Sequence, residues 1–139
     1  MRNKNFREIV INTEYGGFGL SPVAKIKYWQ RKGLRPVLYL FDSEHQNKTY
    51  ISLAEAELVH NTYGVCDVFC EDEDGHLLLS HDIPRDDPDL IAVVKELGPE
   101  KAGDGLSKLK IVEIPADIKW QIEEYDGKEW VAEWHRTWD

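Results

Sequence analysis

Hydrophobic residues along the chain follow the spacing of strands in some stretches and of helices in others. Residues 9–12 predict a strand, and the nearly continuous apolar run 37–41 is typical of a strand covered on both faces. Between them the sequence predicts a helix from Ser21 to about Lys32, since Ser21 is a good N-cap and Pro22 suits the first helical position. Strand, loop, helix and strand in this order are typical of a βαβ unit, whose crossover is right-handed by default.

The middle of the chain, residues 42–82, has a weaker periodicity. Residues 42–48 are polar and predict a loop, and a short helix rich in Ala and Glu is predicted over 53–60. Two strands, 65–70 and 76–80, are predicted on either side of an acidic turn. Because its periodicity is weak, the whole segment is a candidate insertion on a smaller core.

A second main helix is predicted after residue 86. Asp87 and Pro88 form the clearest helix start, because a carboxylate caps the first turn and complements its dipole. Apolar residues then recur at helical spacing: Leu90, Ile91, Val94 and Leu97. Residues 100–107 predict a flexible connection, and 109–114 alternate like a strand.

The C-terminal segment 117–138 predicts a β-hairpin, since Asp126-Gly127 is a strong two-residue turn signal. Apolar residues alternate before the turn and again after it: Ile118, Trp120 and Ile122, then Trp130, Ala132 and Trp134. Together these patterns predict an α+β (or α/β) fold for the single domain 1–139. We expect a mixed sheet of about five or six strands, packed by the helices that begin at Ser21 and Asp87.

Composition limits the classes of function. The 139 residues are 42% hydrophobic, which suits one globular domain with a core of its own. The net charge of -9 argues against DNA or RNA as partners, because their phosphates would be repelled without a local basic patch. A small anionic ligand needs only one or two cations and some backbone donors. No apolar run suits a membrane span or a signal peptide, and the two cysteines suit a reducing compartment, so we expect a cytoplasmic protein.

The strongest candidate site is the segment 12–22, with the sequence NTEYGGFGLSP. Its three glycines, Gly16, Gly17 and Gly19, precede a helix N-terminus, where free N–H groups and the positive dipole end can hold a phosphate. Tyr15 and Phe18 add rings that can stack on a base or sugar. The glycine order matches neither the dinucleotide fingerprint nor the phosphate loop. The alternative is a tight strand-to-helix turn in which the glycines only avoid clashes.

Two arginines, Arg85 and Arg136, are candidate charge partners for such a ligand. Arg136 lies between Trp134 and Trp138 in sequence and can clamp a phosphate or stack on a base. The alternative is that the tryptophans are core residues and that Arg136 pairs with one of the many carboxylates. The complete predicted ligand-binding set is Asn12, Tyr15, Gly16, Gly17, Phe18, Gly19, Ser21, Arg85, Trp134, His135 and Arg136.

We predict no catalytic residues, because neither a serine elbow nor a Cys-His signature is present. The enzymatic alternative depends on His135, which can form an acid–base pair with Glu124 or Glu133 and would then cleave a nucleotide. A non-enzymatic role is therefore favoured over an enzymatic one.

We also predict neither a metal nor another cofactor. Four residues invite a zinc hypothesis: Cys66, Cys70, His76 and His81. Their spacing is unlike that of the common Cys-x2-Cys knuckles, and buried structural cysteines are common. The acidic turn 71–75 resembles part of a calcium loop but fails the twelve-residue pattern.

Four segments resemble a family of small acidic proteins found in bacteriophages and prophages. They are INTEYGGFGLS (11–21), IPRDDPDLIAVVKELG (83–98), LKIVEIP (109–115) and WQIEEYDGKEWVAEWHRTW (120–138), and they cover roughly half of the chain. The segment 42–82 lies outside the resemblance. Phage membership implies a modulator of the host, a class that includes proteins sequestering the nucleotide signals of bacterial immunity.

The leading hypothesis is therefore non-enzymatic binding of a small phosphorylated nucleotide, as a phage counter-defence protein in the host cytoplasm. The alternative is a protein-binding inhibitor of a host protein, acting through the acidic surface and the Trp-rich hairpin. No membrane partner is expected. A homo-oligomer stays open, since sequestering proteins can build pockets between subunits.

Overall fold

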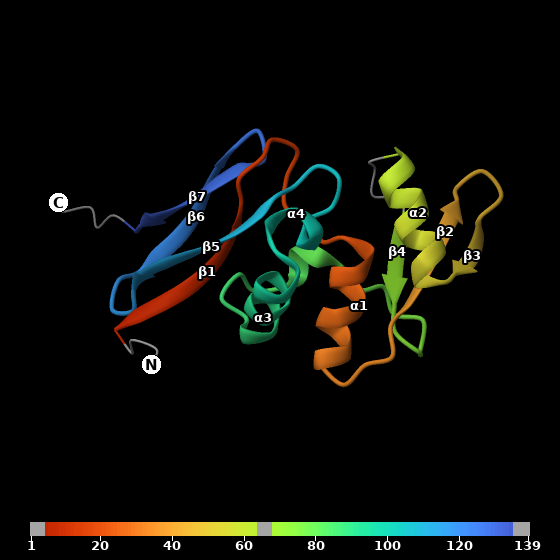
Figure 1. The fold of residues 1–139 in the computed structure, drawn as a ribbon, viewed down its shortest axis with the longest axis horizontal. Coiled ribbons are helices and arrows are strands. Elements are labelled where there is room, and N and C mark those ends of the chain that lie inside the picture. Colours follow the sequence, from red (N-terminus) through yellow and green to blue (C-terminus); the bar gives the residue numbers. More distant parts are fainter. Residues whose placement is uncertain (1–4, 64–67, 135–139) are drawn as a thin grey trace.

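Three small antiparallel sheets and the helices between them make up the fold in the computed structural model, which describes residues 5–63 and 68–134 (Figure 1). The strands are β1 (Phe6–Asn12), β2 (Val37–Asp42), β3 (Asn47–Ile51), β4 (Val68–Glu71), β5 (Leu109–Pro115), β6 (Trp120–Tyr125) and β7 (Lys128–Glu133). The helices are α1 (Pro22–Arg31), α2 (Leu53–Tyr63), α3 (Pro88–Leu97) and the short α4 (Pro99–Ala102). The predicted α+β class and the C-terminal hairpin are confirmed.

The described strands do not form the single mixed sheet of five or six strands that the sequence predicts. Instead, β1 pairs with β5, β2 lies between β3 and β4, and β6 pairs with β7, all antiparallel. β1 and β2 therefore lie in different sheets, and the predicted βαβ crossover is wrong. Helices α1 and α3 lie between these sheets (Figure 1), so α1 carries the chain from one to the other.

Strand β1 is buried on both faces, which accounts for its apolar run. Val10 faces the main core, where it joins Leu109 and buried residues of α1 and α3. Ile9 and Ile11 face the opposite way, into a second cluster with Ile114. The hairpin covers this second cluster with Trp120, Ile122 and Val131. The molecule is therefore layered, with the β6–β7 hairpin on one side of β1–β5 and the helices on the other (Figure 1).

The run 37–41 is not covered on both faces, contrary to the expectation from its apolar pattern. Leu38 and Leu40 belong to the main core cluster. Val37 and Phe41 lie on the other face of β2 and are 41% and 40% exposed. In this strand, therefore, the uninterrupted apolar run does not indicate that both faces are covered. One face packs on the core, and the other carries hydrophobic side chains that solvent can reach.

Three local elements differ from the sequence-based expectation. β3 overlaps the predicted loop 42–48, because its polar residues are held by pairing with β2 and not by an apolar pattern. α4 occupies the start of the predicted flexible connection 100–107. The predicted strand 76–80 is reduced to an isolated bridge with β4 and a 3₁₀ turn at Ser80–Asp82.

The hairpin register separates its tryptophans onto two faces. Ile122 pairs with Val131, and both pack toward β1 and β5. Glu123 pairs with Trp130, whose side chain is 45% exposed on the opposite face. A strand presents alternate residues to opposite faces, so the register set by the two-residue turn decides that the half-buried Trp120 packs toward β1 and that Trp130 faces away from it.

Both predicted helix caps are confirmed. The Ser21 hydroxyl accepts a hydrogen bond from the Ala24 N–H at 3.2 Å. The Asp87 carboxylate, which is buried, accepts one from the Asp89 N–H at 2.8 Å. Asp87 also receives the Tyr28 hydroxyl at 2.7 Å and the Lys32 ammonium at 2.9 Å, so this one carboxylate joins α1 to α3.

Acid is expected to weaken the fold through Asp87. Burial raises its pKa, but the hydrogen bonds from Lys32 and Tyr28 outweigh burial and hold the pKa below the ordinary value. A group whose pKa is lowered by folding stabilises the fold above its unfolded pKa, near 4 for a carboxylate, and loses that contribution as the pH falls through its folded pKa.

Asp87→Asn should therefore lower the free energy of unfolding by about 1–3 kcal/mol at pH 7, because it keeps a capping side chain but removes the charge that Lys32 faces. Urea unfolding at pH 7 and at pH 3 measures the effect, and the difference from wild type should shrink at the lower pH. A difference that stays constant between these pH values would contradict this role of the charge.

Candidate functional site

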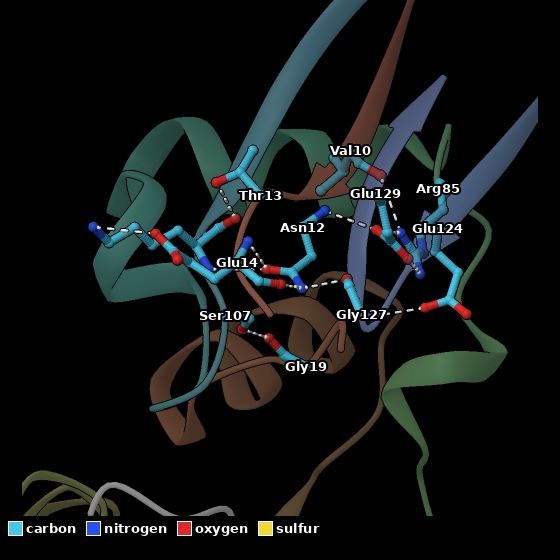
Figure 2. Close-up of polar contacts among 11 residues, drawn as sticks. Val10, Asn12, Thr13, Glu14, Gly19, Arg85, Ser107, Glu124, Gly127 and Glu129 are labelled. Atoms are coloured by element: carbon cyan, nitrogen blue, oxygen red, sulfur yellow. Dashed lines mark hydrogen bonds and ion pairs between the residues drawn. The ribbon is translucent and has the colours of Figure 1, made fainter. Parts of the chain in front are cut away.

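The predicted glycine loop lies between the turn of the β6–β7 hairpin and the loop that follows α4. Gly16 and Gly17 have positive φ angles of 111° and 97°, and the Gly16 N–H donates to the Asp126 carbonyl at 3.0 Å. At Gly19 the chain passes close to Asp104, because a Cβ there would meet the end of the Asp104 carboxylate and force that side chain to shift. The Gly19 carbonyl also accepts the Ser107 hydroxyl at 2.8 Å (Figure 2). These contacts favour the structural interpretation of the glycines.

Asn12 is fully buried and connects three segments (Figure 2). Its side-chain NH₂ donates to the carbonyls of Glu14 and Gly127 at 2.7 and 2.8 Å. Its side-chain oxygen accepts the N–H groups of Glu14 and Lys108, each at 3.1 Å. All polar groups of this amide side chain are thus engaged within the protein.

Arg85 is bound to Glu129 by two parallel hydrogen bonds of 2.6 and 2.8 Å (Figure 2). The side chains of Arg85 and Glu129 are 18% and 8% exposed, so the ion pair is largely buried. The Arg85 guanidinium also lies 3.7 Å from the centre of the Phe18 ring. Two predicted ligand contacts therefore stack on each other, and the positive charge of Arg85 is neutralised internally.

The same ion pair covers the edge of β1 that faces away from β5. The Val10 N–H donates to the Arg85 carbonyl at 2.8 Å, and the Asn12 N–H donates to the Glu129 carboxylate at 2.7 Å. We call Asn12, Arg85, Glu129 and Gly127 the β1 junction. It joins β1, the hairpin and the segment before α3, and it uses the donors that the sequence assigned to a ligand.

The remaining predicted residues are separated. Tyr15 and Trp134 are 56% and 59% exposed, with the ammonium groups of Lys128 and Lys119 respectively 5.9 and 5.6 Å from their ring centres. His135 and Arg136 lie outside the described residues, as does Cys66 of the zinc hypothesis. Ser21 is buried at the start of α1, where a cavity opens.

This cavity has a volume of about 160 Å³ and lies where α1, α2 and α4 meet. It is lined by Ser21, Pro22, Val23, Glu57, His60, Glu100 and Lys101. Ser21 positions its rim, since the Ser21 N–H donates to the Ala102 carbonyl at 2.9 Å and the hydroxyl donates to the Lys101 carbonyl at 2.7 Å. The end of α4 is therefore fixed against the start of α1.

Hydrogen-bond donors of this cavity suit an anionic group. Pro22 has no N–H, and the N–H groups of Ala24 and Lys25 bond to Ser21, which leaves the Val23 N–H as the first-turn donor of α1. Lys101 is exposed at the rim. His60 Nδ1 is buried and has no hydrogen-bond partner within the described structure. A buried polar atom in this condition calls for an explanation.

Two carboxylates, Glu57 and Glu100, also line the cavity. The Glu100 carboxylate lies 3.6 Å from the Lys108 ammonium, which offsets part of its charge. His60 and Lys101 were not predicted from the sequence, because neither belongs to a motif. They reach the cavity from α2 and from α4, and the start of α1 was the one local signal that pointed to this place.

A second cavity, of about 190 Å³, lies on the other side of the loop and is bordered by Phe18, Gly19, Lys25 and Cys70. The Lys25 side chain is buried and donates to the Val68 carbonyl at 2.8 Å. Burial raises the pKa of the Cys70 thiol to about 12, so this thiol is protonated and unreactive at neutral pH.

Of the four residues proposed as zinc ligands, the three in the described structure differ in burial. Cys70 is buried, whereas His76 and His81 are exposed beside Asp72 and Asp82, at 3.2 and 3.6 Å. Among the described residues, carboxylates and a histidine come within ligating distance of one another in two exposed clusters, Asp42–Glu44–His45 and Asp72–Asp74–His76. Exposed acidic clusters of this kind are common without a metal ion.

Comparison of the chain with protein-family models, curated proteins and solved structures found no match. Among the described helices, none is long and apolar enough to cross a membrane.

The β1 junction should dominate the stability of this region. Glu129→Gln keeps the shape of the side chain but leaves Arg85 buried without its charge partner, so the free energy of unfolding should fall by about 3 kcal/mol. Chemical denaturation measures it. The matched control is Arg31→Gln, which breaks an ion pair of 3.0 Å to Asp89 whose Arg31 side chain is 50% exposed, and it should cost less than about 1 kcal/mol. Equal losses in both variants would contradict the assignment.

Proposed function

We propose that this protein binds a small phosphorylated nucleotide without cleaving it, and that the phosphate lies in the cavity at the start of α1. The observation that carries this proposal is the helix N-terminus at residues 21–23, which borders a cavity that Lys101 and His60 also line. Helix N-termini favour anions through their free N–H groups and their dipole.

In this arrangement the phosphate oxygens accept hydrogen bonds from the Val23 N–H and the Lys101 ammonium, and the His60 side chain lines the same cavity. Glu57 and Glu100 oppose the positive potential of Lys101 and the helix N-terminus, and they disfavour a polyphosphate more strongly than a singly charged phosphate, such as the diester of a cyclic nucleotide. The cavity of about 160 Å³ is smaller than the roughly 300–1,000 Å³ of pockets that enclose a whole small molecule. The base and sugar therefore extend outside it.

The resemblance to phage proteins supports a biological role for such binding. A protein that holds a cyclic nucleotide without reacting with it would sequester a host immune signal in the host cytoplasm. The protonated Cys70 thiol and the structural engagement of Arg85 support a binding role over a catalytic one.

Calorimetric titration with a panel of cyclic nucleotides and cyclic ADP-ribose isomers tests the proposal. At least one member should bind, and Lys101→Gln should weaken its affinity roughly tenfold, the effect of losing about 1.4 kcal/mol of binding free energy. Lys110→Gln, which removes an exposed ammonium from β5, is the matched control and should leave the affinity unchanged. The absence of both heat and a thermal shift with every member would sink the proposal. Recovery of the ligand intact after long incubation separates binding from cleavage.

A second candidate function is inhibition of a host protein through the hairpin. Its specific support is the exposure of three aromatic side chains on or beside the hairpin strands: Tyr125 at 72%, Trp130 at 45% and Trp134 at 59%. Exposed aromatic residues are enriched at the centres of protein interfaces.

If the hairpin binds a host protein, replacing Trp130 and Trp134 by Ser should abolish capture of that protein from a host lysate, because these rings supply the buried contact area. Tyr15→Ser removes a comparably exposed ring outside the hairpin and serves as the control. Capture that survives the tryptophan replacements in a folded variant would argue against this interface.

A further inference from the structure

An aromatic row crosses the outer face of the β3–β2–β4 sheet. The Tyr39 ring stacks on Phe69 with centres 5.6 Å apart and packs against Tyr50 at 5.9 Å, so each strand contributes one ring. Tyr39 is buried beneath its neighbours, whereas Tyr50 and Phe69 are 58% and 37% exposed. With the half-exposed Val37 and Phe41, these residues form the outer aromatic face.

Beside this face, strand β3 has an open edge. β3 is an edge strand in the sheet order β3-β2-β4, and its residues are exposed or, at Ile51, half-buried. In the described part of the chain no strand pairs with this edge. Figure 1 shows β3 at the end of the molecule opposite the hairpin. The corresponding edge of β1 is different, because Arg85 and Glu129 occupy its N–H groups.

Lys48, the one lysine of β3, binds Glu71 of β4 and so does not shield the open edge of β3. Lysines on edge strands discourage pairing with another chain. The Lys48 ammonium, however, donates to Glu71 at 2.7 Å and lies 4.9 Å from the centre of the Tyr39 ring. Glu71 also accepts the Tyr50 hydroxyl. The charge of Lys48 is thereby drawn across the outer face toward β4 and away from the open edge.

Carboxylates surround one end of this surface. A groove of about 550 Å³ is bordered by Val37, Tyr50, Glu71, Asp72 and Glu73. Lys48 and Tyr50 hold the pKa of Glu71 below its ordinary value, and the His76 N–H does the same for Asp72, so both are ionised at neutral pH. Lys48 neutralises Glu71, but Asp72 and Glu73 leave the groove acidic.

We propose that this surface binds an extended, lysine- or arginine-bearing segment of a partner protein. The segment pairs with the open edge of β3 as a further strand, places apolar side chains against the outer aromatic face and directs its cationic side chains to Asp72 and Glu73. Main-chain pairing supplies affinity, and the alternate side chains supply specificity. This surface is distinct from the cavity at α1 and does not depend on the nucleotide proposal.

The negative charge of the groove distinguishes among three possible occupants: single-stranded RNA, a second copy of the chain and a cationic polypeptide. Aromatic rings on a sheet also stack the bases of single-stranded RNA, but such sites need a positively charged path for the phosphates. Here Asp72 and Glu73 would repel them. A second copy of the chain would bring another net charge of -9. A cationic polypeptide strand is the occupant whose charge complements the groove.

Selection from a displayed library of random twelve-residue peptides on the full chain tests the inference. The selected peptides should be rich in Lys or Arg alternating with β-branched or aromatic residues. Glu73→Lys should weaken their binding at least tenfold, whereas Glu133→Lys, a matched reversal on β7, should change it less than twofold. Hydrogen exchange of the full chain with a selected peptide should slow at the amides of Asn47–Ile51.

Five results would overturn the inference. The first three are enrichment of no peptide or of acidic peptides, equal binding to the Glu73→Lys and Glu133→Lys variants, and slowed exchange in the hairpin or α1 instead of β3. The fourth is tighter binding of an oligouridine than of the selected peptides. A doubled mass in light scattering with β3 amides already protected would assign the edge to a second copy and would also overturn it.

Discussion

The buried pairing of Arg85 with Glu129 is the interaction on which one part of the structure depends, the part made of β1, the hairpin and α3. It joins a residue before α3 to one in β7. Both residues also bind the outer edge of β1, Arg85 through its main-chain carbonyl and Glu129 through its carboxylate. A charge this far from solvent is costly when unpaired, so the hairpin, β1 and α3 must be held in one relative position. Asn12 extends the same constraint to the hairpin turn and to the residue before β5.

This constraint changes which part of the glycine loop can serve a ligand. The Gly16 N–H donates to the Asp126 carbonyl in the hairpin turn, and Phe18 and Arg85 stack on each other. The residues that follow the loop, at the start of α1, instead border a cavity where α1 meets α2 and α4. We therefore propose the anion site at residues 21–23, where His60 and Lys101 line the cavity beside the helix N-terminus.

The outer edges of β1 and β3, toward opposite ends of the molecule, differ in whether their main-chain N–H groups are bonded. At β1, the Arg85 main-chain carbonyl and the Glu129 carboxylate accept the outward N–H groups of Val10 and Asn12, and the edge is closed. At β3, the edge remains open and its lysine is bound to Glu71. An open edge beside an aromatic face is a liability in a monomer, and such edges are retained where they have a use. This contrast is why we propose the β3 surface, and not the β1 surface, as a site of interaction.

The sequence by itself determined the local features, because each depends on residues a few positions apart. The caps at Ser21 and Asp87 and the Asp126-Gly127 turn follow from short-range backbone chemistry. Only the tertiary structure decided how the strands divide into three sheets, that polar β3 is a strand, and that Trp130 is exposed. It also decided the sites: Asn12 and Glu129 are 117 positions apart, and no local pattern encodes which distant side chain satisfies a given buried donor.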